Sequence, residues 1–240
     1  MSKGVDVNTK NNDGWTPLHW AAWDHNVEVI KFLAFKGADV NVKSDGGFTP
    51  LHWAVSLENV EVIQFLMSQG ADANAKDDDG KTPLHWAAAK KNVEVIQPLI
   101  SQGTNVNAQD DDGKTPLHRA AAWDNNNDVE AIKFLVSQGA DVNAKDNEGN
   151  TPLLYLVIWS ENVEIFKFLV SKGADVNAKN NDGETPLHQT AAWNHNVEVT
   201  KFLISQGADV NAKTADGETP LNLAKRYTRS EVIEYLSSIK

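Results

Sequence analysis

Thr16-Pro17-Leu18-His19 is the stretch that decides the fold, because copies of it recur along the whole chain. Full copies begin at Thr49, Thr82, Thr115 and Thr185, and partial copies that keep Thr-Pro-Leu begin at Thr151 and Thr219. The seven threonines are spaced 33, 33, 33, 36, 34 and 34 residues apart. Such regular spacing is typical of proteins that stack one small unit many times, so we expect a row of similar units instead of one central core.

Each copy of the motif has the residues that begin a helix. Thr16 is a favourable N-cap residue, and Pro17 follows at the first helical position, where its missing N–H costs nothing. Asn26 is the expected N-cap of a second helix, which Gly37 ends. A turn-rich stretch then reaches Gly47, just before the next Thr-Pro pair. One unit therefore consists of two short helices followed by a hairpin-like loop.

This pattern resembles the ankyrin repeat, a family whose units carry Thr-Pro-Leu-His in the first helix and Gly-Ala-Asp-x-Asn after the second. The second motif occurs as GADVN at residues 37–41, 139–143, 173–177 and 207–211. The resemblance covers almost the whole chain. It implies antiparallel helix pairs with hairpin loops at right angles, a concave face, and a role in protein–protein binding. We therefore predict an all-α fold, an ankyrin-repeat solenoid of seven helix-turn-helix units joined by hairpin-like loops.

The spacing of the repeats predicts a single domain over residues 1–240, since a repeat array has no central core to divide. Residues 1–10 are predicted to be the tail of a missing or partial repeat, because Gly4-Val5-Asp6-Val7-Asn8 matches the end of a unit whose helices are absent. The predicted units span about residues 11–43, 44–76, 77–109, 110–145, 146–179, 180–213 and 214–240.

The turn between the two helices departs from the family pattern. Family members commonly place glycine there, whereas the matching positions of this chain hold His25, Glu58 and Lys91. A positive φ costs more for a residue with a Cβ atom than for glycine. We therefore expect the conformation of this turn to differ from that of the family.

Composition excludes several classes of protein and site. The chain has 22 Lys and Arg against 33 Asp and Glu, and the net charge of -11 opposes binding to the phosphates of nucleic acid. Because the chain has no cysteine, disulfides, thiolate metal sites and cysteine nucleophiles are excluded. The amino-terminal residues lack an apolar signal core, and no stretch approaches the 18 or so apolar residues of a membrane span. We expect a soluble, cytoplasmic monomer that binds neither nucleic acid nor membranes, with secretion as an effector left open.

Five histidines recur at one position of the repeat and are predicted to be structural: His19, His52, His85, His118 and His188. Zinc requires its ligands to converge at about 2.0–2.1 Å. Equivalent positions in successive repeats are instead displaced by roughly a helix diameter, about 10 Å. The family resemblance implies that each histidine bonds to nearby backbone and tethers neighbouring loops. We therefore predict no metal site at these residues and no bound cofactor.

The remaining polar residues do not form a recognisable catalytic motif. None of the hydroxyl, histidine and aspartate residues lies in a nucleophile elbow or a phosphate-binding loop, so we expect no enzyme activity. The aspartate runs at residues 77–79 and 110–112 fall on predicted hairpin tips, where aspartate stabilises turns. Asp124 and Asp128 flank an oxygen-rich segment and are candidate calcium ligands, although the glycine and distal glutamate of an EF-hand loop are missing. A calcium-stabilised repeat protein is therefore one alternative.

Tryptophan is the most distinctive residue of the chain, with eight copies. Trp20, Trp53 and Trp86 directly follow the histidine of the motif, where the family usually has leucine, and Arg119 takes this position in the fourth unit. These tryptophans either fill the core of the first helices with a larger side chain or form an exposed ladder that contacts a partner.

Other candidate binding residues lie at positions that face ligands in the family. Trp15 and Phe48 precede the threonine of the motif, and Trp23 lies three residues after Trp20. Lys81 and Lys114 take the same hairpin position in the third and fourth units. The last three units have Asn150, Glu184 and Glu218 at this position. We therefore predict a non-catalytic module that binds a partner protein through its concave groove and hairpin tips. The alternative from another class is a targeting or scaffold segment of a larger enzyme or secreted effector.

Overall fold

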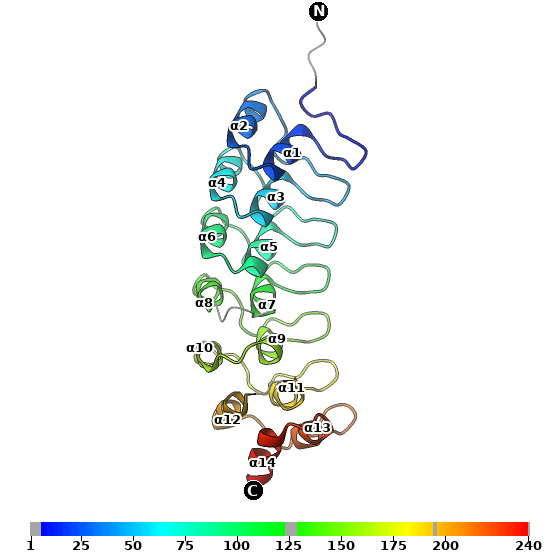
Figure 1. Cartoon of the computed structure of the whole chain (residues 1–240), viewed down its shortest axis with the longest axis vertical. Coiled ribbons are helices and arrows are strands. Elements are labelled where there is room, and N and C mark those ends of the chain that lie inside the picture. Colours follow the sequence, from blue (N-terminus) through cyan, green and yellow to red (C-terminus); the bar gives the residue numbers. More distant parts are fainter. Residues whose placement is uncertain (1–5, 123–128, 194–195, 240) are drawn as a thin grey trace, which may run out of the picture. The chain divides into compact units, whose positions relative to one another are not determined.

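The computed structural model describes residues 6–122, 129–193 and 196–239 of the chain. Within these ranges it contains fourteen α-helices and no β-strand, as the sequence predicted. The chain divides into two compact parts, Met1–Asp111 and Asp112–Lys240, which we call the first unit and the second unit. A single helix pair with its hairpin loop is called a repeat. Each unit is built from helix pairs, and each pair is followed by a loop that leads to the next pair (Figure 1).

The first unit contains three helix pairs, and its helices form two rows. The first helix of each pair contacts the first helix of the next pair, and the second helices contact one another in the same way (Figure 1). Hairpin loops lie on the side of the first helices that faces away from the second helices (Figure 1). The helices are α1 (Pro17–Trp23), α2 (Val27–Phe35), α3 (Pro50–Ser56), α4 (Val60–Ser68), α5 (Pro83–Lys90) and α6 (Val93–Ser101).

The second unit repeats this arrangement with four helix pairs. The first helices α7, α9, α11 and α13 contact one another in order, and α10, α12 and α14 form a row of second helices. The helices are α7 (Pro116–Ala121), α8 (Glu130–Ser137), α9 (Pro152–Trp159), α10 (Val163–Ser171), α11 (Pro186–Trp193), α12 (Val197–Ser205), α13 (Pro220–Arg226) and α14 (Ser230–Ser238).

The motif residues begin the helices as predicted. α1 starts at Pro17 after Thr16, whose extended backbone is typical of an N-cap. α2 starts after Asn26, and the Asn26 side chain accepts a hydrogen bond of 3.1 Å from the backbone N–H of Val29. Leu18 is fully buried, and so are the leucines at the same position of the next two pairs, Leu51 and Leu84. The motif therefore both starts the helix and supplies its core residue.

The turn between the helices does not differ from the family pattern in the way we expected. His25, Glu58 and Lys91 adopt φ angles of 55°, 58° and 59°, which lie in the left-handed region that favours glycine. A left-handed conformation costs a residue with a Cβ atom roughly 1–2 kcal/mol. A Cβ atom at this position therefore does not exclude the left-handed conformation, contrary to our expectation.

Neighbouring hairpins of each unit are joined by a repeated set of hydrogen bonds. In the first unit the backbone N–H of Asp45 donates to the carbonyl of Asp13 at 3.1 Å. The ammonium groups of Lys10, Lys43 and Lys76 each donate to a backbone carbonyl 33 residues further along the chain, at 2.8, 2.6 and 2.9 Å. In the second unit, Lys145 reaches the carbonyl of Lys179 in the same way. These bonds hold each hairpin against the next one.

Glycines at the hairpin tips allow the hairpins to approach closely. Gly47 has a φ of +73°, and a Cβ atom there would lie only 2.5 Å from Asp78 Oδ1 and 2.7 Å from Asp78 N. Gly217 occupies the same place in the last hairpin with a φ of +79°, but nothing would lie within 4 Å of its Cβ. The close contact therefore depends on the presence of a following hairpin.

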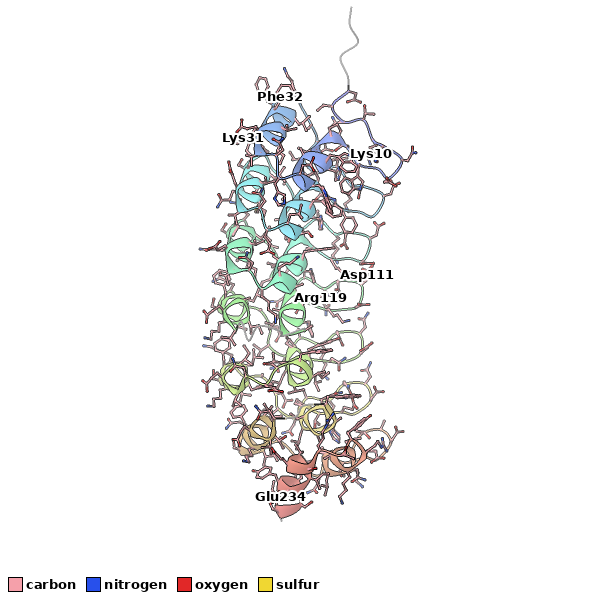
Figure 2. The ribbon with its side chains drawn as sticks, viewed as in Figure 1. Lys10, Lys31, Phe32, Asp111, Arg119 and Glu234 are labelled. Atoms are coloured by element: carbon pink, nitrogen blue, oxygen red, sulfur yellow. The ribbon has the colours of Figure 1, made fainter. Side chains whose placement is uncertain are left out.

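The first helix pair has an apolar surface that is covered in later pairs. Val29 of α2 is 40% exposed, whereas the equivalent Val62 and Val95 are fully buried. Phe32 and Phe35 of α2 are 57% and 83% exposed. Figure 2 shows Phe32 at α2, on the opposite side of the first unit from Asp111 on a hairpin.

In the described residues, no helix has both the length and the apolar character needed to cross a membrane.

Candidate functional site

Six aromatic residues of the first unit gather where the hairpins meet the first helices. We call them the aromatic cluster: Trp15, Trp20, Trp23, Phe48, Trp53 and Trp86. Trp15 and Phe48 are the last residues of two hairpins, directly before the helix N-caps Thr16 and Thr49. The other four belong to α1, α3 and α5. The cluster therefore joins three successive repeats.

Trp15 lies at the centre of the exposed part of the cluster. Its ring centroid lies 4.8 Å from that of Trp20, 4.8 Å from that of Trp53 and 6.1 Å from that of Trp23. Trp23 and Trp53 are also in contact, with centroids 5.0 Å apart and an edge-on geometry. Tilted and edge-on contacts at these distances are the favoured arrangements of aromatic rings. The rings therefore hold one another in place.

Phe48 extends the cluster towards the third helix pair. Its ring centroid lies 5.3 Å from that of Trp53 and 5.7 Å from that of Trp86. Trp53 and Trp86 are partly buried, whereas Trp20 is 50% exposed and Trp23 is 43% exposed. The two interpretations of the tryptophan ladder, core filling and exposure, therefore each describe a different pair of residues. Trp53 and Trp86 partly fill the space between hairpin and helix, and Trp20 and Trp23 present large apolar surfaces to solvent.

The indole N–H groups of Trp86 and Trp53 differ in their hydrogen bonding. The indole N–H of Trp86 donates to Asp77 Oδ2 at 3.1 Å. One repeat earlier, Ser44 takes the position of the aspartate, and it does not reach Trp53 with a hydrogen bond. Ser44 Oγ and Trp53 Nε1 are both buried and lack hydrogen-bond partners within the described residues. An unpaired buried polar group of this kind costs roughly 1–3 kcal/mol.

Two carboxylates lie at the hairpin tips beside the aromatic cluster. Asp45 packs against Gly14, the residue before Trp15, and Asp78 packs against Gly47, the residue before Phe48. Both aspartates are exposed. Among the described residues, neither carboxylate forms a hydrogen bond or an ion pair. The cluster is thus bordered by negative charge that the first unit itself does not neutralise.

The predicted basic residues are held by nearby acids. Lys81 Nζ lies 2.6 Å from Asp79 Oδ2 in the first unit. Lys114 and Arg119 belong to the second unit, where they lie 3.4 and 3.9 Å from Asp112 Oδ2. Such surface ion pairs stabilise a protein by about 0–1 kcal/mol. Their main effect here is to neutralise the charges that we had assigned to partner binding.

The repeated histidines connect the hairpins to the helices. The backbone N–H of Thr16 donates to His19 Nδ1 at 3.1 Å, which leaves Nε2 as the protonated nitrogen. His19 Nε2 then donates to the carbonyl of Phe48 on the following hairpin, 3.0 Å away. His52 reaches the carbonyl of Lys81 at 3.3 Å. His85 of the first unit forms interactions as well. In the second unit, His118 and His188 reach the carbonyls of Asn150 and Glu218.

Burial favours the neutral form of three of these histidines, His19, His52 and His188. Desolvation lowers the pKa of His52 to about 4, although its bond to the Lys81 carbonyl acts in the opposite direction. Desolvation likewise lowers the pKa values of His19 and His188. A neutral imidazole can accept from one backbone group and donate to another, as this geometry requires.

The described residues contain no group of three or more His, Asp or Glu side chains arranged to hold a metal ion. The calcium candidates Asp124 and Asp128 lie outside the described residues. The expectations about calcium and other cofactors therefore remain predictions.

Sequence reasoning missed Asp45 and Asp78 as site residues, because it treated the aspartates of hairpin tips as turn formers. An alignment of the repeats against one another contains the missing signal. Asp45, Asp78 and Asp111 hold a tip position that is occupied by Asn12 in the first repeat and by Asn147, Asn181 and Ala215 in the last three repeats. The acidic residues at this position thus all belong to the first unit, which also carries the aromatic cluster.

Comparison with known proteins agrees with this architecture. A family model of ankyrin repeats in three copies matches residues 37–110, 84–180 and 154–240, and a model of the single ankyrin repeat matches residues 13–45. Among solved structures, the chain is similar to the ankyrin-repeat domain of Bcl-3, described as a unique member of the IkappaB protein family. The two are 30% identical with a TM-score of 0.77, and the match covers 94% of this chain and 100% of that one. No curated protein matches the chain significantly.

Proposed function

Because this chain belongs to the ankyrin-repeat family, we propose that it is a non-catalytic module that binds a partner protein through the aromatic cluster of its first unit. The fold is that of a protein-interaction module. The observation that carries the choice of surface is the exposure of Trp20 and Trp23, at 50% and 43%, within a cluster of ordered rings.

The physical properties of the cluster favour binding. Tryptophan is enriched among the residues that dominate interfaces, where its truncation commonly costs about 2 kcal/mol or more. Trp15 contacts both exposed tryptophans, so these rings lose little conformational freedom when a partner covers them. A pre-ordered aromatic surface therefore offers apolar area at a low entropic cost.

Partner capture from a lysate of the source cells tests this surface. The immobilised chain is compared with the triple variant Trp15→Ala, Trp23→Ala and Phe48→Ala. Phe35→Ala is the matched control, because Phe35 is an 83% exposed aromatic residue of the same unit that lies on α2, outside the cluster.

We expect the triple variant to lose the captured partner and the Phe35→Ala variant to keep it. Circular dichroism of both variants establishes that the helices remain folded. Equal capture by the wild type and the folded triple variant would remove the aromatic cluster from the proposal. Loss of capture with Phe35→Ala alone would move the binding surface to α2.

A further inference from the structure

The first unit combines two features in the same repeats. The exposed rings of Trp20 and Trp23 lie on α1 beside the partly buried hairpin residue Trp15, and the unpaired carboxylates of Asp45 and Asp78 lie at the adjoining hairpin tips. The second unit also has exposed tryptophans, Trp159 at 45% and Trp193 at 47%, but it lacks the acidic feature at the matching tip positions. The matching tip positions of the second unit are Asn147, Asn181 and Ala215. The coincidence of rings and charge in one unit restricts the chemistry of the partner.

None of the nearby cations of the first unit is in place to neutralise these carboxylates in the described structure. Lys10, Lys43 and Lys76 donate their ammonium groups to backbone carbonyls. Lys81 pairs with Asp79. The chain as a whole has a net charge of -11, so an acidic partner segment would be repelled from this surface.

Positive charge suits both features of the surface. The face of an indole ring attracts cations, and the attraction is stronger for tryptophan than for the other aromatic residues. A carboxylate beside the ring adds a charge-assisted hydrogen bond. The guanidinium of arginine fits better than an ammonium, because its plane stacks on an indole while its edge donates two parallel hydrogen bonds to a carboxylate.

We infer that the aromatic cluster recognises arginine side chains in an extended segment of the partner, with the guanidinium groups stacking on the exposed indoles and pairing with Asp45 and Asp78. This inference rests on the proposed function and specifies the partner of the same surface. Neighbouring hairpins are about 10 Å apart, by the width of a helix. An extended chain rises about 3.3 Å per residue, so arginines three residues apart match the two carboxylates.

The test is a calorimetric titration of the full chain with the hexapeptide GRAARG and with its lysine and glutamine counterparts, GKAAKG and GQAAQG. The key variant is Asp45→Asn with Asp78→Asn, which installs the residue that this chain already carries at positions 147 and 181. The matched control is Asp182→Asn with Asp216→Asn, which changes the net charge equally at exposed hairpin residues of the second unit.

We expect GRAARG to bind the wild type and the control variant with similar affinity, and the Asp45→Asn/Asp78→Asn variant about tenfold more weakly. Trp20→Ala with Trp23→Ala should weaken binding by a similar factor, and GQAAQG should not bind. Equal affinity for wild type and the Asp45→Asn/Asp78→Asn variant, an equal loss in the control variant, or equal binding of GKAAKG would overturn the inference.

Failure of this inference is distinguishable from failure of the proposed function. If the Trp15→Ala, Trp23→Ala, Phe48→Ala variant loses the native partner while the Asp45→Asn/Asp78→Asn variant keeps it, the aromatic cluster is a binding surface that does not use arginine. If the triple variant keeps the native partner, the proposed function fails whatever the peptide does.

Discussion

The first and second units build the same backbone surface from different chemistry. In the first unit, the hairpin position and the first-helix position hold the rings of Trp15 and Trp20, which contact each other in a tilted arrangement. The corresponding residues Glu184 and Gln189 of the second unit form a hydrogen bond with each other. The first of these two pairs keeps apolar area exposed at Trp20, whereas the second pair uses much of its own hydrogen-bonding capacity.

Other repeats of the second unit follow the same rule. Arg226 pairs with Glu218, and the hydroxyl of Tyr155 donates to Asp146 Oδ2 at 2.7 Å. Burial, together with the bond to Asp146, raises the pKa of Tyr155, so its hydroxyl remains a donor. Residues that already have internal partners gain little from a new contact. The comparison teaches that the fold leaves these positions free to vary and that binding capacity depends on which of them stay unpaired.

The largest loss of stability is expected from disrupting the close contact between two hairpins of the first unit at Gly47. Gly47→Ala combines a positive φ with a clash against Asp78, so it should lower the free energy of unfolding by about 3 kcal/mol. Gly217→Ala has the same kind of backbone strain with no neighbour within 4 Å, so about 1 kcal/mol is expected there. Urea unfolding measures both values. Equal losses would show that the clash contributes nothing.

Acid should weaken the hydrogen bonds by which the repeated histidines connect helices to hairpins. Asn222 of the second unit suggests the variant that tests this expectation. The pKa of His52 is about 4 in the folded chain and near 6.5 when unfolded, so its contribution is present above pH 6.5 and is lost as the pH falls towards 4. The loss from this group is about 3 kcal/mol. His52→Asn introduces the residue that the last repeat has at the equivalent position, Asn222. There, Thr219 Oγ1 lies 2.5 Å from Asn222 Oδ1.

The measurement is the free energy of unfolding of the wild type and the His52→Asn variant between pH 7 and pH 4. We expect the advantage of the wild type over the variant to shrink steadily across this range, because the other titrating groups are common to both proteins. A difference that stays constant with pH would show that His52 does not contribute through its protonation.

A smaller change should come from giving Trp53 the hydrogen-bond partner that Trp86 has. Ser44→Asp places a carboxylate where Asp77 lies in the next repeat, so it should raise the free energy of unfolding by about 1–2 kcal/mol. Asp77→Ser is the reverse exchange and should lower it by a similar amount. Thermal unfolding of the two variants checks the pair, and a Ser44→Asp protein less stable than the wild type contradicts the explanation.

The smallest effect concerns the left-handed residues between the helices. Among the described residues three of the four non-glycine examples, His25, Glu58 and Lys91, lie in the first unit, and Thr228 lies in the second. Thr228→Gly should raise the free energy of unfolding by up to about 1 kcal/mol, because it relieves a β-branched residue at positive φ. Glu58→Gly should have almost no net effect, since it also removes the bond of 2.7 Å from Asn92. Denaturant unfolding of both variants distinguishes these outcomes.

Local rules were sufficient to predict most of the fold. The Thr-Pro pairs at residues 16, 49 and 82 located the starts of α1, α3 and α5, because capping and the fixed φ of proline act within a few residues. The turn at His25 could not be predicted this way, since the local preference of residues with a Cβ atom disfavours the positive φ that His25 adopts. The same limit applies to Ser44, whose missing bond to Trp53 depends on two segments meeting in space.

The lysine bonds between hairpins have a consequence for how the length of such a chain can change. Lys10, Lys43 and Lys76 each reach a carbonyl 33 residues ahead, and Lys145 reaches one 34 residues ahead. Duplicating or deleting one entire repeat in a gene leaves every remaining lysine with an equivalent acceptor. Adding a single residue inside a repeat shifts the acceptor relative to the donor and must be absorbed by a loop. Evolution by whole modules is therefore the route that preserves these bonds.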